Sequence, residues 1–142
     1  MSSYLIVSDG GSRGNPGPAA SAFVVFQDGK QNFMAGFYWG RKTNNQAEYL
    51  ALIMALEWLK KEDLSLEDEI TFRSDSELMI KQLKGEYKVK SPQIRILFEK
   101  SRQLLQSLSE RGVSFRLEHK LRQHTHSADS LLNKILDMVS QK

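Results

Sequence analysis

Apolar and polar positions in the first part of the chain form short runs separated by breaks, a pattern typical of β-strands. Tyr4–Ser8 is an apolar run, and Ala20–Gln27 is a second run that is rich in Phe and Val. Asp28-Gly29 follows as a two-residue hairpin signal, and Gln31–Trp39 is the returning run. The pattern therefore predicts three strands, of which the last two are antiparallel.

The apolar spacing then changes to the three-to-four-residue period of helices. The first such segment is Asn45–Lys60, with Thr43 or Asn44 as a natural N-cap. Two further strands are predicted at Glu69–Asp75 and Val113–Leu121, and three further helices at Ser76–Gly85, Pro92–Leu108 and Ser127–Val139. The order β-β-β-α-β-α-α-β-α predicts an α/β fold, with a mixed sheet flanked by helices. The chain shows no internal repeat or boundary, so we expect one domain over residues 1–142.

Composition narrows the functional classes. With 40% hydrophobic and 26% charged residues, the chain of 142 residues has the make-up of a globular protein. Its net charge of +3 favours an anionic partner only weakly. The absence of cysteine excludes disulfides and thiolate metal sites, which leaves carboxylates, histidines and carbonyls as metal ligands. No apolar run is long enough for a membrane span or a signal core, so we expect a cytoplasmic protein and no membrane partner.

Four acidic residues stand where secondary-structure elements begin or end. Asp9 is expected to end the first strand and Asp75 the fourth, whereas Glu48 and Asp129 fall in the first turns of predicted helices. Each acid alone has an ordinary explanation as a turn residue, a cap or a helix-dipole partner. If the first and fourth strands are neighbours, however, the acids converge, and their repulsion would favour a hard cation such as Mg²⁺ or Mn²⁺. Two such ions can split phosphodiesters.

Four motifs in order resemble the ribonuclease H family, type 1 branch, over nearly the whole chain. They are "DGGSRGNPGPA" (Asp9–Ala19), "RKTNNQAEYLALIMALEW" (Arg41–Trp58), "FRSDSELMIKQLKGEYKVKS" (Phe72–Ser91) and "HSADSLLN" (His126–Asn133). The resemblance implies a ribonuclease H-like fold, with a five-stranded mixed sheet whose first three strands are antiparallel. It also implies a metal-dependent endoribonuclease that cuts the RNA strand of RNA–DNA hybrids and leaves 5′-phosphate and 3′-hydroxyl ends.

The same resemblance implies roles for individual residues. The acids of the four motifs are the catalytic and metal residues, namely Asp9, Glu48, Asp75 and Asp129, and they hold two Mg²⁺ or Mn²⁺ ions. Arg41 and Thr43 match positions that hold a phosphate of the DNA strand. Asn15, Asn44 and Asn45 match positions that contact the minor groove and the RNA 2′-hydroxyls. Turn formation and helix capping are the structural alternatives for these five polar residues.

The fourth motif departs from the family pattern. Thr125 stands where an asparagine is usual, four residues before Asp129. Many members also have a loop histidine that assists proton transfer or product release. His124 lies in the predicted loop and is the candidate helper, whereas His119 falls in a predicted strand. A structural role is the favoured alternative for each of the three histidines, His119, His124 and His126.

Two other functions stay open at this level. The first is a non-catalytic module that binds hybrid or double-stranded RNA through the same groove, which loss of an acid would favour. The second is an enzyme of the same fold that cuts double-stranded RNA or DNA, against which the three asparagines argue. A monomer is the default assembly.

Overall fold

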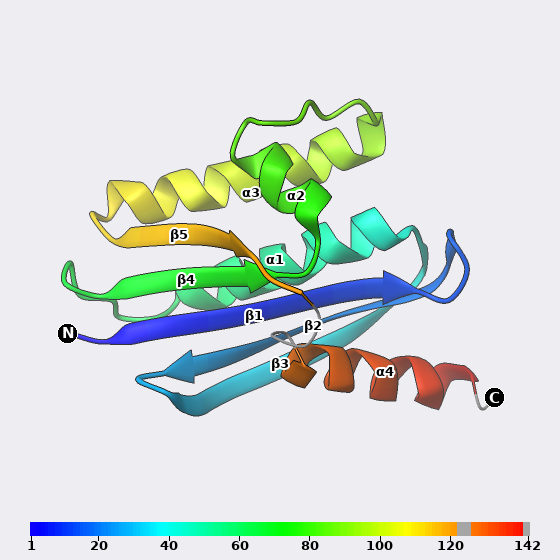
Figure 1. The fold of residues 1–142 in the computed structure, drawn as a ribbon, viewed down its shortest axis with the longest axis horizontal. Helices are drawn as coiled ribbons and strands as arrows, with labels where there is room; N and C mark the ends of the chain where they lie inside the picture. Colours follow the sequence, from blue (N-terminus) through cyan, green and yellow to red (C-terminus); the bar gives the residue numbers. More distant parts are fainter. Residues whose placement is uncertain (122–125, 141–142) are drawn as a thin grey trace.

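The protein, described by a computed structural model over residues 1–121 and 126–140, is a five-stranded sheet with helices on both faces (Figure 1). The elements follow the predicted order: β1 (Ser3–Ser12), β2 (Gly17–Gln27), β3 (Lys30–Lys42), α1 (Asn44–Lys60), β4 (Glu69–Ser74), α2 (Glu77–Leu83), α3 (Pro92–Glu110), β5 (Ser114–His119) and α4 (His126–Ser140). Among the described helices, none combines the length and the apolar character required to cross a membrane.

The strands lie in the order β3-β2-β1-β4-β5. The pairs β1–β2 and β2–β3 are antiparallel, and β1–β4 and β4–β5 are parallel, which confirms the predicted mixed sheet. Asp28 and Gly29 both have positive φ and form the tight turn between β2 and β3, as the hairpin signal predicts. Because β1 and β4 are parallel neighbours, the residues that come after their last paired positions, Ser8 and Ser74, lie side by side.

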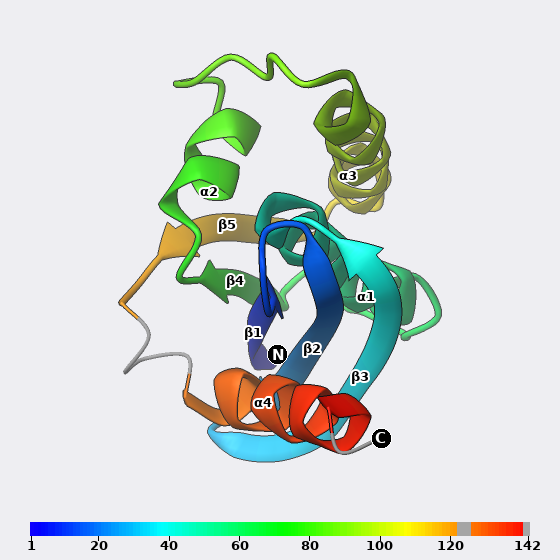
Figure 2. The same ribbon diagram turned by 90° about the vertical axis from the view of Figure 1, so that its right-hand side faces the viewer.

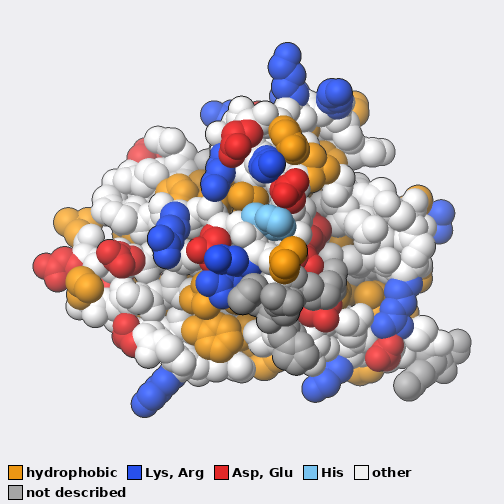
Figure 3. Space-filling view, viewed as in Figure 1, with side chains coloured by type: hydrophobic (Ala, Val, Ile, Leu, Met, Phe, Trp, Pro, Cys, Tyr) orange, Lys and Arg blue, Asp and Glu red, His pale blue; other side chains and the backbone are white. Residues whose placement is uncertain are grey.

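Helices cover the two faces of the sheet unequally (Figure 2). On one face α1 packs against β1 and β2, and α3 packs against α1; Ile6, Leu52 and Phe72 belong to the core between these layers. On the other face α4 crosses β1, β2 and β3, and Val7 contributes to its core contacts together with Ala128. Beside α4 a hollow of about 670 Å³ runs along β1 and β4, and basic, acidic and hydrophobic side chains are interspersed on this face (Figure 3).

One sequence expectation is wrong: Asp9 does not end the first strand. β1 continues through Gly10 and Gly11 to Ser12, in antiparallel pairing with β2. α1 lies directly on this part of β1, and a side chain at position 10 would collide with it. A Cβ at Gly10 would lie 2.2 Å from the carbonyl carbon of Ala47. Gly10 therefore permits close packing of α1 against β1, a role in the fold that the sequence alone does not reveal.

Candidate active site

Three of the four predicted acids converge where β4 ends beside β1. Asp9, Glu48 and Asp75 each offer a carboxylate oxygen, and these three oxygens all lie within 4.8 Å of one another. Asp9 and Asp75 come together because Ser8 on β1 pairs with Ser74 on β4, so that the next residue of each chain segment falls at the same level. The condition on which convergence depends, that the first and fourth strands are neighbours, is therefore met, and their pairing brings together acids that are 66 positions apart in the chain.

Glu48 reaches this group from the second turn of α1; the expectation that it lies in the first turn is wrong, because the helix already begins at Asn44. Its side chain is almost fully buried, with 8% of the residue's surface exposed. Its Oε1 accepts a hydrogen bond of 2.5 Å from the backbone N–H of Gly10, which ties the side chain to β1. Burial raises the pKa of the Glu48 carboxyl well above its usual value, and the charges of Asp9 and Asp75 raise it further. A site that holds three carboxylates so close together is electrostatically costly unless protons or a cation compensate their charge.

This raised pKa predicts how the stability of the metal-free protein depends on pH. A folded-state carboxyl that binds its proton more tightly than the unfolded chain stabilises the fold at low pH, and that contribution is lost as pH rises above the ordinary value of 4.5. We therefore expect Glu48→Gln, which keeps the acceptor for Gly10 but cannot ionise, to be more stable than the wild type at pH 7. Thermal unfolding in chelator from pH 4 to pH 8 measures this difference. A stability gap that shrinks with rising pH would contradict the assignment.

The donor set fits a hard divalent cation. Three carboxylate oxygens from separate elements, without sulfur or a described histidine among them, are the ligands that Mg²⁺ and Mn²⁺ prefer. A hollow of about 390 Å³ lies beside them and is lined by Glu48 and Asp75 together with Asn44, Asn45 and Arg13. The larger hollow along β1 and β4 does not include any of the three acids. The smaller one therefore marks the surface from which a substrate would approach the carboxylates.

Asp129, the fourth predicted acid, is not a member of the three-residue carboxylate group. It lies in the first turn of α4, where its Oδ1 accepts a hydrogen bond of 3.3 Å from Nδ2 of Asn133. Asn133 in turn lines the hollow beside Glu48 and Asp75. The helix thus presents its first turns toward the site, and a metal role for Asp129 stays a prediction. Asn133 was missed in the sequence because an exposed helical asparagine carries no distinguishing signal.

Two of the predicted substrate-binding asparagines join the β1–β2 loop to α1. The N–H of Asn44 donates to Oδ1 of Asn15 at 3.0 Å, and Oδ1 of Asn44 accepts from the N–H of Ser12 at 2.8 Å. Both side chains are exposed, so their amide NH₂ groups are the polar atoms left to face a ligand. Asn45, also exposed, lines the hollow. These three asparagines lie together beside the carboxylates, and their substrate contacts remain predictions.

Thr43 is the N-cap of α1, one of the two alternatives that the sequence offers. Its hydroxyl accepts a hydrogen bond from the N–H of Gln46 at 3.2 Å, and the Gln46 side chain accepts from the N–H of Thr43 at 2.9 Å. This reciprocal pair is a capping box, which fixes where the helix begins. Arg41 is exposed two residues earlier, near the end of β3. Joint binding of a phosphate by Arg41 and the N-terminus of α1 stays a prediction.

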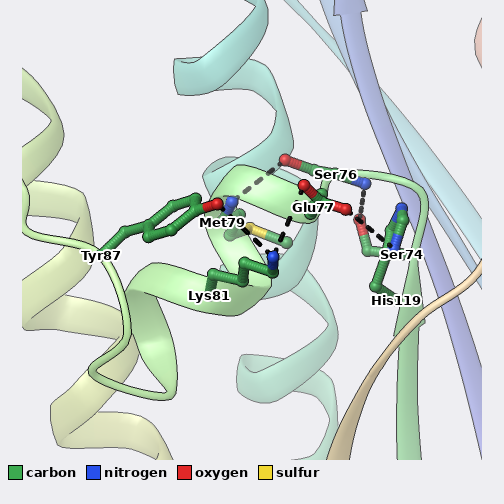
Figure 4. A network of polar contacts seen from close by, with 7 residues as sticks. All are labelled: Ser74, Ser76, Glu77, Met79, Lys81, Tyr87 and His119. Atoms are coloured by element: carbon green, nitrogen blue, oxygen red, sulfur yellow. Dashed lines mark hydrogen bonds and ion pairs between the residues drawn. The ribbon is translucent and has the colours of Figure 1, made fainter.

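His119 has a structural contact near the site. It is the last residue of β5, and its Nδ1 lies 3.8 Å from Oε2 of Glu77 in the first turn of α2 (Figure 4). Lys81 extends the same polar network, through an ion pair with Glu77 and a hydrogen bond to the hydroxyl of Tyr87 (Figure 4). The contact links the end of β5 to the helix that follows Asp75.

The candidate helper His124 and the unusual Thr125 lie outside the described residues. His126 is the first residue of α4, as its backbone shows. The role assigned to His124 stays a prediction.

The chain is similar in sequence to known proteins. The family model described as RNase H matches residues 1–139. A ribonuclease HI of Halobacterium salinarum is 42% identical over 130 residues, which cover 91% of this chain. A bifunctional protein of Mycobacterium tuberculosis is 34% identical over 139 residues, or 96% of this chain. The chain spans 62% of the length of the first relative and 36% of the length of the second.

Solved structures extend the likeness to three dimensions. LC11-RNase H1, isolated from compost by a metagenomic approach, superposes with a TM-score of 0.87 at 38% identity and covers 98% of this chain and 99% of its own. The same protein in complex with an RNA/DNA hybrid gives a TM-score of 0.83 at 37% identity, with coverage of 96% and 98%. The five-stranded sheet with its three leading antiparallel strands is therefore the architecture of these structures.

Proposed function

The chain belongs to the ribonuclease H family, and from this premise we propose that it is a metal-dependent endoribonuclease that hydrolyses the RNA strand of RNA–DNA hybrids. The observation that carries the proposal is the convergence of Asp9, Glu48 and Asp75 on one point beside an open hollow. The solved complex of LC11-RNase H1 with an RNA/DNA hybrid supports the choice of substrate.

In this proposal Asp9, Glu48 and Asp75 hold the ions, and Asp129 on α4 completes the set of four acids. Two bound Mg²⁺ or Mn²⁺ ions would supply Lewis acidity to the scissile phosphate and its attacking water, giving 5′-phosphate and 3′-hydroxyl ends. The protein's own contribution is preorganisation: the Gly10 N–H fixes the Glu48 carboxyl, and paired strands fix Asp9 against Asp75. Outside the described residues, His124 is the proposed helper in proton transfer or product release.

Polar side chains around the hollow would select the hybrid. Asn15, Asn44 and Asn45 would reach the minor groove, where amide groups can bond to the 2′-hydroxyls that distinguish RNA from DNA. Arg41 and Thr43 would hold a phosphate of the opposite, DNA strand. Residues 1–142 would act as one ribonuclease H domain, monomeric and in the cytoplasm.

A comparison of substrates tests this proposal. With Mg²⁺ present, we expect a hybrid to be cut in its RNA strand, and a DNA duplex of the same sequence to be left intact, because it lacks the 2′-hydroxyls. A double-stranded RNA of the same sequence is the third substrate, and we expect it to be cut more slowly, because its second strand is not DNA. Denaturing electrophoresis with a label on each strand in turn gives the rates. Equal cleavage of hybrid and DNA duplex would overturn the role of the 2′-hydroxyl.

A further inference from the structure

β3 exposes aromatic side chains that the proposed hydrolysis does not use. Phe37 is 52% exposed, and its ring lies 4.5 Å from that of Trp39, centroid to centroid, with the two planes tilted by 53°. Phe33 on the same strand differs, because its ring stacks on Trp58 of α1 at 5.3 Å. Phe37 and Trp39 thus form a pair at the outer edge of the sheet, which we call the β3 platform.

The β3 platform is attached to the backbone that carries Glu48. Trp39 donates from Nε1 to Oγ of Ser21 at 2.8 Å, and the Ser21 hydroxyl donates to the carbonyl oxygen of Ala47 at 2.6 Å. Ser21 is fully buried, and Ala47 directly precedes Glu48 in α1. This chain of hydrogen bonds fixes the indole ring relative to the carboxylates, as a preorganised contact surface requires.

The charges on β3 favour an anionic partner. The strand contains Lys30, Arg41 and Lys42 and no acidic residue. Arg41 and Lys42 follow the platform after one glycine, and β3 is an edge strand of the sheet. Aromatic rings beside cations are the combination with which proteins bind single-stranded nucleic acid, since the rings stack on bases and the cations contact phosphates.

We infer that the β3 platform binds unpaired bases of the DNA strand where that strand extends beyond the hybrid. The inference rests on the proposed function, in which Arg41 holds a DNA phosphate and β3 leads away from that point. Bases inside a duplex are stacked on their neighbours and cannot lie on Phe37, whereas unpaired bases can. The platform would therefore favour hybrids that end in single-stranded DNA over blunt hybrids.

Equilibrium binding to four labelled hybrids tests the inference, with chelator present to prevent cleavage. The hybrids share one duplex and are blunt, extended by six thymidines at the DNA 5′ end, extended likewise at the DNA 3′ end, or extended by six uridines on the RNA. We expect one DNA extension to tighten binding at least about fivefold, since stacking of one base is worth roughly that much or more. Equal affinity for blunt and both DNA-extended hybrids would overturn the inference, and so would an equal gain from the RNA extension.

Variants locate the effect. Phe37→Leu removes the ring but keeps an apolar side chain. In this variant the ratio of the affinity for the DNA-extended hybrid to that for the blunt hybrid should fall to about one. Met34→Ala, at a 43% exposed position of the same strand, should keep that ratio. Because both affinities in the ratio are measured on the same protein, a general loss of affinity does not change the ratio. A wild-type ratio in Phe37→Leu would refute the inference that the β3 platform binds unpaired bases. Cleavage of the blunt hybrid in Mg²⁺ is measured separately, so that failure of the proposed activity is distinguished from failure of the platform.

Discussion

Replacing Asp9 with asparagine is expected to lower hybrid cleavage about 10³-fold or more, because a metal contributes several kcal/mol to transition-state stabilisation and each 1.4 kcal/mol is tenfold in rate. Asp9 is fully buried between Glu48 and Asp75, so no solvent-exposed group can take over its position. The same change should not harm folding. It removes one of the charges that repel Glu48, and we expect equal or higher thermal stability without metal.

The measurement is the single-turnover cleavage rate of Asp9→Asn in Mg²⁺, together with Mn²⁺ binding by electron paramagnetic resonance. Asp63→Asn is the matched control, because Asp63 is an exposed acid beyond the end of α1. It should retain wild-type cleavage and Mn²⁺ binding. Cleavage at the wild-type rate by Asp9→Asn would show that the acids have been assigned the wrong role.

Replacing Gly10 with alanine is expected to destabilise the protein by about 3 kcal/mol, at the upper end of the usual cost of overpacking a core. The added methyl group would lie 2.2 Å from both the carbonyl carbon and the carbonyl oxygen of Ala47. These are backbone atoms, which cannot rotate away, so α1 must move off β1. That movement would also displace Glu48, whose carboxylate accepts from the Gly10 N–H, and cleavage should fall with stability.

Gly11→Ala is the neighbouring control. A Cβ there would lie 3.5 Å from Cδ2 of Leu132, an ordinary van der Waals contact. We expect its free energy of unfolding in urea to stay within about 1 kcal/mol of the wild type. Similar stabilities for the two alanine variants would show that Gly10 is not required for the close packing of α1 against β1.

The sequence predicts the order of elements well because its local signals are strong. The Asp28-Gly29 turn and the change from strand to helix spacing after Trp39 have one simple interpretation each. The proximity of Asp9 and Asp75 cannot be predicted from local signals. It depends on the parallel pairing of β1 with β4, which no local pattern encodes, and the sequence can only state it as a condition.

Features that depend on contacts between distant segments have no local signal in the sequence. The run after Asp9 has the composition of a turn, yet it continues β1, because pairing with β2 and close packing of α1 outweigh local preference. The sequence predicts substrate contacts for Asn15 and Asn44, and the structure adds that their side-chain oxygens join the start of α1 to the end of β1 and the loop that follows it. Both uses are compatible, since each amide has a donor side as well as an acceptor side.

Reversible metal dependence of hybrid cleavage tests the central claim most directly. A hybrid labelled on both strands is incubated with the wild-type protein in Mg²⁺, then in excess chelator, and then after Mg²⁺ is restored. We predict that the RNA strand is cut into fragments with 5′-phosphate ends, that chelator stops the reaction, and that restored Mg²⁺ resumes it, while the DNA strand stays intact throughout. Undiminished cleavage in chelator, or cleavage of the DNA strand, would contradict the account.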